Sequence, residues 1–368
     1  MTKSVAIIGS RGYPSYYGGF ETLVRRLAPY LVDEGWDVTV YGRKGSTTPD
    51  DPARDDRVKT ATTLGIESKS ISTLSYGLTS CTHAARRRPD VAFVLNVANG
   101  FFFPVLKARK IPIIVNVDGI EWEREKWGAK AKAAFRAGAR MTAKHADEIV
   151  CDSQEIARRW KVDFDRDGVY IPYGGTDPGL LNPIDELSGH PYILMVARFV
   201  PENTMDDFLT AAIDLSKRWK VAIVGSSGYG GELDDRVAGL AANNANIHWF
   251  GHIHDDNKLF ALWQHATVYF HGHSVGGTNP ALVQAMASGA PVVARDTIYN
   301  REVLGESGLF VQADPIEITQ TIDRLMGDSP LREQFQTQAK IRAKETYTWE
   351  SVCAAYEQLL ASYLPTRR

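Results

Sequence analysis

The stretch "HGHSVGGTNPALVQAM" (271–286) places glycines directly before the start of a helical pattern, an arrangement that suits phosphate binding. An apolar run ends at its beginning, and a helical pattern opens at Thr278, with Pro280 in the first turn where its missing N–H is not needed. Backbone N–H groups at a helix N-terminus favour an anion, and glycines let a phosphate approach. We expect Gly277, Thr278 and Asn279 to meet a phosphate; the alternative is an ordinary capped helix after a tight turn.

Arg198, in "VARFVPEN" (196–203), directly follows another apolar run. An arginine at a strand end can hold a phosphate pair through two parallel hydrogen bonds, and a surface salt bridge is the alternative. The loop "VGSSGYGGE" (224–232) also follows an apolar run and is rich in glycine and serine. Three such loops at one edge of a parallel sheet would make one phosphate site.

The first loop, "GSRGYPSYYGGFE" (9–21), carries a Gly18-Gly19 pair just before a helical pattern. Its spacing matches neither the dinucleotide fingerprint nor the P-loop. Glycines there usually mean that a ligand approaches the backbone closely. The loop's tyrosines are candidates for stacking on a sugar, with local packing as the alternative: Tyr13, Tyr16 and Tyr17.

A second group of polar side chains lies in "DGIEWEREKW" (118–127), again after an apolar run. Asp118, Glu121 and Arg124 could bind the hydroxyls of a sugar. A carboxylate pair such as Asp118 and Glu121 would also suit general-base catalysis in an inverting reaction. Asp118 could alternatively cap a helix.

The histidines indicate no metal site. His271 and His273 lie two residues apart, on one face of an extended segment, but a third ligand is missing. We predict that His273 lies near the donor sugar, with packing as the alternative. No metal and no cofactor is expected.

These residues must be positioned by two series of short apolar strands that alternate with amphipathic helices. The first series is expected at 4–8, 37–41, 91–95, 112–117 and 148–151, and the second at 192–197, 220–225, 247–251, 267–272 and 291–295. Continuous apolar strands separated by helices predict parallel sheets covered on both faces. The fold class is therefore α/β, with two Rossmann-like, doubly wound domains facing each other across a cleft.

The best domain boundary is the segment 172–191, which is rich in proline and glycine. We predict an N-terminal domain over 1–182 and a C-terminal domain over 183–348. A helical run at 349–364 follows the last strand of the second series, and we expect it to complete the first domain.

Composition restricts the class of protein and its partners. The chain has 368 residues, 44% of them apolar, with a net charge of −2, and its three cysteines lack C-x-x-C pairing. We see no leader and no apolar run of ~18 residues, and we expect a cytoplasmic protein. A basic helix at 124–145 makes contact with an anionic membrane surface plausible, with a solvated face as the alternative. Nucleic acid is not an expected partner, since no recognition motif appears.

With these motifs in hand, the chain resembles the GT-B glycosyltransferases of family four, and especially a bacterial subgroup that includes rhamnosyltransferases of capsule and exopolysaccharide synthesis. The resemblance covers essentially the whole chain. It rests on "GSRGYPSYYGGFE", "DGIEWEREKW", "IPYGG" (171–175), "VARFVPEN" and "HSVGGTNPALVQAM".

The resemblance implies a retaining, metal-independent transferase. Gly18 and Gly19 would lie against the donor diphosphate, and Arg198 would contact its phosphates. Thr278 and Asn279 would present backbone amides to the diphosphate and the sugar, while the opening loop faces the acceptor. Because the leaving phosphate serves as the base in such enzymes, the resemblance implies sugar positioning for Asp118.

Three positions depart from the wider family, in which a lysine stands five residues after the arginine and two glutamates lie eight residues apart. Those positions are Asn203, Gly276 and Gln284 here. A neutral Gln284 has one acceptor for the 3′-hydroxyl of a deoxyribose, whereas a glutamate suits both hydroxyls of a ribose. This fits a thymidine diphosphate donor better than a uridine or guanosine one, with drift at a tolerant position as the alternative.

We therefore predict transfer of a sugar, with rhamnose from dTDP-rhamnose as the best candidate, to a lipid-linked glycan in cell-surface polysaccharide synthesis. The alternatives are a catalytically silent subunit for binding or assembly, which the changes at Asn203 and Gln284 would suit, and another GT-B enzyme such as a nucleotide-sugar epimerase. A phosphorylase would need a pyridoxal lysine, and no suitable loop of the second domain carries one.

Overall fold

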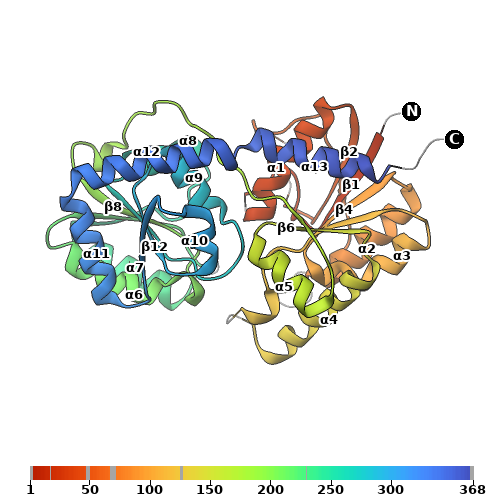
Figure 1. Ribbon diagram of the computed structural model, residues 1–368, viewed down its shortest axis with the longest axis horizontal. Helices are drawn as coiled ribbons and strands as arrows, with labels where there is room; N and C mark the ends of the chain where they lie inside the picture. The colour runs from red at the N-terminus through yellow and green to blue at the C-terminus, as the bar shows by residue number, and fades with distance from the viewer. Residues whose placement is uncertain are drawn as a thin grey trace. The chain divides into compact units, whose positions relative to one another are not determined.

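The computed structural model describes residues 3–16, 18–46, 50–66, 72–124, 127–228 and 230–364. The chain forms two compact units. The first unit comprises Met1–Pro172 and Trp349–Arg368, and the second comprises Tyr173–Thr348. Helices cover both faces of the sheet in each unit (Figure 1).

The described strands of the first unit form a parallel sheet in the order β3-β2-β1-β4-β5-β6-β7. These strands are β1 (Lys3–Ile8), β2 (Trp36–Gly42), β3 (Lys59–Thr62), β4 (Val91–Leu95), β5 (Ile113–Asn116), β6 (Glu148–Cys151) and β7 (Val169–Tyr170). The helices are α1 (Gly19–Asp33), α2 (Ser72–Arg87), η1 (Val97–Phe102), α3 (Phe103–Lys107), η2 (Glu121–Glu123), α4 (Ala129–His145), α5 (Gln154–Phe164) and α13 (Trp349–Ser362), where η denotes a 3₁₀ helix.

The described strands of the second unit form a parallel sheet in the order β10-β9-β8-β11-β12-β13. These strands are β8 (Tyr192–Val196), β9 (Lys220–Val224), β10 (Ile247–Trp249), β11 (Val268–His271), β12 (Val292–Arg295) and β13 (Gly308–Val311). The helices are η3 (Asp185–Leu187), η4 (Pro201–Asn203), α6 (Met205–Leu215), α7 (Glu232–Asn243), α8 (Asp256–His265), α9 (Pro280–Ser288), α10 (Ile298–Leu304), α11 (Pro315–Gly327) and α12 (Ser329–Thr346).

Alternation along the strands gives the second sheet two buried faces. Ile193 and Met195 of β8 belong to one apolar cluster with Phe208 of α6, whereas Leu194 belongs to another cluster with Leu282 of α9. The prediction of an α/β chain with two doubly wound parallel sheets is confirmed. In each sheet the strand order reverses beside the first strand, between β1 and β4 and between β8 and β11. Ligands of such folds bind at these reversals, outside the carboxyl ends of the strands.

The chain leaves the first unit earlier than the boundary at 182/183 predicts, because the intervening segment is bonded into the second unit. The N–H of Thr176 donates to Gln284 Oε1 over 3.0 Å, and the N–H of Leu181 donates to Gln264 Oε1 over 2.8 Å. At the other end, α13 packs beside α1 in the first unit, the blue helix beside the red one in Figure 1.

Candidate functional site

In the second unit, Arg198 stands just past the carboxyl end of β8, and its side chain is exposed. Among the residues that the structure describes, no hydrogen bond or ion pair engages its guanidinium. Its carbonyl is held instead, because Asn203 Nδ2 donates to Arg198 O over 2.9 Å. Asn203 is itself buried, so this amide braces the loop that presents Arg198. The charge of Arg198 is therefore available to a ligand.

The loops that follow β8 and β11 are joined to each other by hydrogen bonds. Ser274 donates twice to Glu202 O, from its N–H over 3.0 Å and from its hydroxyl over 2.7 Å. Thr204 Oγ1 donates to Gly272 O over 2.6 Å, and Arg295 Nη1 donates to the same hydroxyl over 3.1 Å. These bonds fix the two loops at the strand reversal as one rigid edge.

The helix start predicted at residues 278–280 is present. Asn279 is the N-cap of α9, its Oδ1 accepts from Ala281 N over 3.0 Å, and Pro280 occupies the first turn. Gly276 has a φ of +103°, which favours glycine. In the described part of the structure, no acceptor lies within hydrogen-bonding distance of the N–H groups of Gly277 and Asn279, so both are available to an anion. Thr278, beside them, is buried.

His273 lies at the base of this loop, with its ring stacked on His271 at 4.4 Å between centroids and an interplanar angle of 13°. His271 is buried, and its Nδ1 lies 2.9 Å from the hydroxyl of Tyr269. Burial, and secondly the neighbouring His273, lower the pKa of His271 well below 6.5, so its ring stays neutral. The described residues contain no group of three or more His, Cys, Asp or Glu side chains that could hold a metal ion.

Both polar atoms of the Gln284 side chain make hydrogen bonds within the protein. Its Oε1 accepts from Thr176 N over 3.0 Å, and its Nε2 donates to Thr176 O over 2.8 Å and to Ser288 Oγ over 3.2 Å. The side chain therefore pairs with both main-chain groups of Thr176 and ties that segment to α9. One lone pair of Oε1 remains for a further donor.

In the first unit, the glycine pair lies at the start of α1. Gly18 is the N-cap, with extended backbone angles, and its carbonyl accepts from Thr22 N over 3.0 Å; Gly19 is the first residue of the helix. The loop before it is fixed by Glu21, a buried residue whose Oε1 accepts from Arg11 N over 3.0 Å. The paired glycines thus place backbone, rather than side chains, at this edge of the sheet.

The structure does not support the loop tyrosines as a sugar-stacking group. Tyr13 is 0% exposed, because its ring belongs to the core and its hydroxyl accepts from Asp55 N over 3.2 Å, so its assignment to acceptor binding is wrong. Tyr16 is half-buried, with its hydroxyl on Asp51 Oδ1 at 3.1 Å and the Arg25 guanidinium 4.1 Å from its ring centre. Tyr17 lies outside the described residues.

The carboxylates after β5 form an internal network. Arg124 Nε lies 2.6 Å from Glu121 Oε1, and the side chains of both residues are less than 10% exposed. Trp127 Nε1 donates to Glu121 Oε2 over 2.9 Å, so both carboxylate oxygens are occupied. Arg124 Nη2 also lies 3.6 Å from Asp118 Oδ2. Glu121 and Arg124 are therefore structural partners of each other in this conformation.

Asp118 differs from its neighbours. Its side chain is 25% exposed, and its φ of +56° is unusual for a residue other than glycine. Ile120 occupies the N-cap of η2, so the helix-capping alternative for Asp118 is wrong. A carboxylate held in a strained backbone at a strand end is the type of group that serves a ligand.

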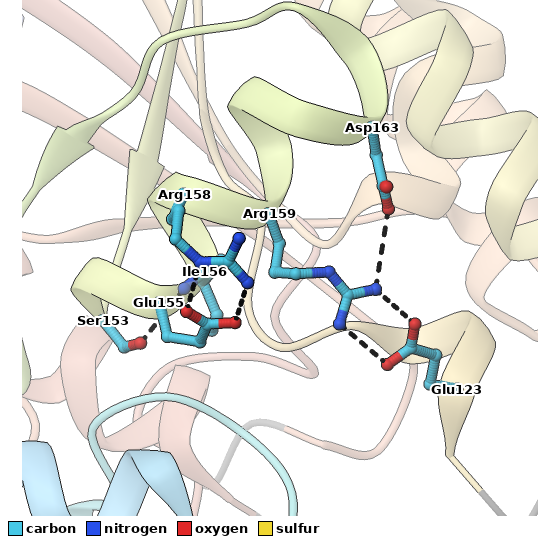
Figure 2. A network of polar contacts seen from close by, with 7 residues as sticks. All are labelled: Glu123, Ser153, Glu155, Ile156, Arg158, Arg159 and Asp163. Atoms are coloured by element: carbon cyan, nitrogen blue, oxygen red, sulfur yellow. Dashed lines mark hydrogen bonds and ion pairs between the residues drawn. The ribbon is translucent and has the colours of Figure 1, made fainter.

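A separate ion pair joins η2 to α5, as Figure 2 shows. Arg159 forms an ion pair with both oxygens of Glu123 and lies 3.7 Å from Asp163 Oδ2. Ser153 caps α5 by accepting from Ile156 N over 3.2 Å. These contacts anchor the segment that carries Asp118. Sequence reasoning missed the pair between Glu123 and Arg159, as it missed Arg295 and Thr204, because these partners lie 36 and 91 residues apart in the chain.

Two families match the chain. Residues 2–177 match the domain of unknown function DUF1972, and residues 190–328 match "Glycosyl transferases group 1". The phosphatidyl-myo-inositol mannosyltransferase of Mycobacterium leprae is 30% identical over 214 residues, which cover 54% of this chain and 55% of that protein. The MMP alpha-(1->4)-mannosyltransferase of Mycolicibacterium hassiacum is 35% identical over 115 residues, 29% and 28% of the two chains. The chain thus spans about half the length, or less, of these curated relatives.

Solved structures are similar over nearly the whole chain. The sucrose-phosphate synthase of Thermosynechococcus elongatus has a TM-score of 0.79 at 19% identity, covering 98% of both chains. HepE of Anabaena, solved in complex with UDP, has a TM-score of 0.74 at 15% identity, covering 98% of this chain and 100% of that one. At such identities the likeness shows the fold, which is that of the GT-B proteins.

Proposed function

We propose that this chain, which has the GT-B fold and a group 1 glycosyltransferase domain at residues 190–328, transfers a sugar from a nucleoside-diphosphate donor. The observation that carries the proposal is the edge of the second sheet where β8 meets β11. There an exposed arginine and two available helix-terminal N–H groups stand on loops that hydrogen bonds hold together.

The chemistry at this edge is electrostatic. Charge that develops on the leaving diphosphate would be stabilised by the Arg198 guanidinium and by the N–H groups of Gly277 and Asn279, in the manner of an oxyanion hole. Because the donors are fixed before the reaction, little reorganisation opposes it. Asp118, a partly exposed carboxylate of the first unit, would position the transferred sugar, and we propose that the reaction retains the configuration of that sugar.

We further propose dTDP-rhamnose as the donor, as in the rhamnosyltransferases that the sequence resembles. Supporting it is the neutral Gln284, which keeps only one lone pair for a nucleotide hydroxyl and turns its amide to Thr176 and Ser288. The matched curated relatives are named mannosyltransferases, and the HepE complex holds UDP. Direct comparison of nucleotides is therefore essential.

The first prediction tests the phosphate site by calorimetric titration with dTDP and UDP. Arg198→Ala removes charge-assisted hydrogen bonds worth roughly 1.5–3 kcal/mol each, so affinity should fall more than tenfold. Thermal stability should change little, because the side chain is exposed and no hydrogen bond or ion pair joins it to a described residue. Arg324→Ala, at an exposed position on α11, is the matched control and should bind normally.

Equal affinities of Arg198→Ala and wild type would remove Arg198 from the site. Equal affinities of wild type for dTDP and UDP would remove the deoxyribose argument. A protein that binds dTDP with the expected dependence on Arg198, yet neither transfers nor hydrolyses any donor, would support the silent-subunit alternative; interconversion of nucleotide sugars would support the epimerase.

For the acceptor we propose a lipid-linked glycan, reached at the cytoplasmic face of an anionic membrane. The supporting observation is α4, which contains no acidic residue and exposes Lys130, Arg136, Arg140 and Lys144. Their spacing places all four on one face of the helix. The similar protein of Mycobacterium leprae is a phosphatidyl-myo-inositol mannosyltransferase, which supports a lipid acceptor here. No helix among the described residues is long and apolar enough to cross a membrane.

The second prediction concerns this face. Charge reversal of Lys130, Arg136 and Arg140 together should release the protein from anionic vesicles in a flotation assay, since each basic residue contributes about 1 kcal/mol. Donor hydrolysis should be unaffected. The matched control reverses three exposed cations of the second unit: Lys217, Arg324 and Lys344. Wild-type protein that stays unbound at low salt would contradict the proposal.

A further inference from the structure

The last helix of the chain is connected to Asp118 through one buried side chain, that of Asn116. This asparagine is the last residue of β5. Its Oδ1 accepts from Asp118 N over 2.9 Å, and its Nδ2 donates to the hydroxyl of Tyr356, in α13, over 2.8 Å. Tyr356 lies 240 residues beyond Asn116 in the chain, so only the fold brings the three residues together.

These two hydrogen bonds fix the orientation of the Asn116 amide. A backbone N–H can only donate, so the amide oxygen must face Asp118 and the NH₂ group must face Tyr356. Burial raises the pKa of the Tyr356 hydroxyl above its ordinary value of 10.0, which keeps this acceptor neutral. The tyrosine ring packs against Phe93 of β4, with 5.1 Å between the ring centres, and this contact holds the hydroxyl in place.

The bond from Asp118 to Asn116 closes a turn that holds Asp118 in an unfavourable conformation. The φ of Asp118 is +56°, in the left-handed region that a residue with a Cβ rarely occupies. Such a backbone persists only where its surroundings fix it. An asparagine side chain that bonds the N–H two residues further on fixes a turn in this way. Without that bond Asp118 would relax, and the direction of its Cα–Cβ bond would change.

The carboxylate of Asp118 depends on this turn for its position. Arg124 Nη2 lies 3.6 Å from Asp118 Oδ2, which is too long for a hydrogen bond. Among the residues with described positions, none donates a hydrogen bond to this carboxylate. The backbone of Asp118 therefore sets where the carboxylate points, and the backbone is held by Asn116.

We propose that Tyr356 is a positioning residue for the transfer reaction, which acts through Asn116 to hold the Asp118 carboxylate at the transferred sugar. The inference rests on the proposed function, which gives Asp118 its role. Tyr356 itself contacts no reacting atom. Because Arg198 and the start of α9 belong to the second unit, binding of the nucleotide should not depend on Tyr356.

The first measurement is hydrogen exchange at single amides of the isotope-labelled full chain, and it needs no substrate. Tyr356→Phe removes only a hydroxyl, so Asn116 loses the partner that fixes its amide. We expect the Asp118 amide to exchange about fivefold faster, as weakening of one hydrogen bond implies. The amides within β5 should exchange as in wild type, which shows that the sheet is intact. Tyr363→Phe is the matched control beyond the end of α13, because its hydroxyl bonds Glu148 Oε2 over 3.0 Å.

The second measurement separates positioning from a general loss of stability. With dTDP-rhamnose as donor, Tyr356→Phe should lower kcat for hydrolysis about tenfold, because small misplacements at a reacting centre are costly. The affinity for dTDP should stay at the wild-type value. In an Asp118→Ala background the same substitution should change kcat less than about twofold, since its effect passes through the missing carboxylate. Tyr363→Phe should leave kcat unchanged in both backgrounds.

Three results would overturn this role of Tyr356. They are unchanged exchange at Asp118 in Tyr356→Phe, faster exchange with unchanged kcat, and an equal fall in kcat with and without the Asp118 carboxylate. Wild-type protein that shows no turnover would contradict the proposed function rather than the connection from Tyr356 to Asp118, because the exchange measurement supports or rejects that connection by itself.

Discussion

The two units differ in whether the charged side chains at their strand ends are bonded to other residues of the protein. In the second unit, Arg198 is exposed and its guanidinium makes no hydrogen bond or ion pair with a described residue. Only its backbone carbonyl is held, by a hydrogen bond from Asn203. In the first unit, Glu121 and Arg124 are buried and form an ion pair with each other, with Trp127 Nε1 on the remaining oxygen of Glu121. Both sets of residues look equally functional in the sequence. The difference teaches that a charge at a strand end is available to a ligand only where the fold has not already supplied its partner.

The largest effect should come from breaking the buried ion pair of the first unit. Glu121→Ala removes the carboxylate that lies 2.6 Å from Arg124 Nε, and removing one partner of a buried ion pair costs about 3–5 kcal/mol. We expect urea unfolding to show a loss of that size. Glu123→Ala is the matched control, because its side chain is 50% exposed and its pair with Arg159 should contribute about 1 kcal/mol or less. Equal losses in the two variants would contradict the comparison.

A substitution at Gln284 should have an intermediate effect. This residue was predicted to bind the nucleotide-sugar donor, and in the structure its side chain bonds Thr176 and Ser288. In the native protein Gln284 Nε2 donates to Thr176 O over 2.8 Å. In Gln284→Glu a carboxylate oxygen would take the place of that donor and would face the carbonyl oxygen of Thr176. We expect the free energy of unfolding to fall by about 1–3 kcal/mol, the cost of a buried unpaired group. Gln320→Glu on the exposed face of α11 is the control. If stability is unchanged while UDP binding improves, Gln284 serves the nucleotide rather than Thr176.

The smallest effect depends on pH and concerns the base of the donor loop. The pKa of His271 is lowered by burial, so below pH 6.5 the unfolded chain binds a proton that the folded chain does not. Stability from this group is therefore full above pH 6.5 and declines as pH falls, by up to about 1.4 kcal/mol per pH unit. Urea midpoints between pH 7.5 and 5 should show a shallower decline for His271→Phe than for wild type. Parallel curves would contradict a neutral, buried His271.

What the sequence could predict depends on how local the signal is. The start of α9 was predictable, because the cap Asn279, Pro280 and the preceding glycines are adjacent in the chain. The expected strands lie close to the observed ones, since continuous apolar runs mark buried parallel strands. β3 was missed because its sequence, KTAT, is polar and mostly exposed at the edge of the sheet.

Features that depend on distant partners were not predictable. Nothing local shows that the hydroxyl of Tyr13 meets Asp55, or that Gln284 would pair with Thr176, which lies 108 residues away. Sequence patterns predicted that the candidate site residues lie at the carboxyl ends of the strands. Which of these side chains are available to a ligand depends on tertiary contacts that the sequence patterns do not show.

The position of α13 has a consequence for synthesis of the chain. Asn116 Nδ2 donates to the hydroxyl of Tyr356 over 2.8 Å, and Tyr356 is almost fully buried against Phe93. Neither contact exists until the ribosome has made the whole second unit, which takes roughly 10–35 s at typical rates of elongation. Through that interval the first unit keeps an apolar groove and an unpaired amide exposed. A nascent chain of this protein should therefore depend on chaperones longest for the half that is made first.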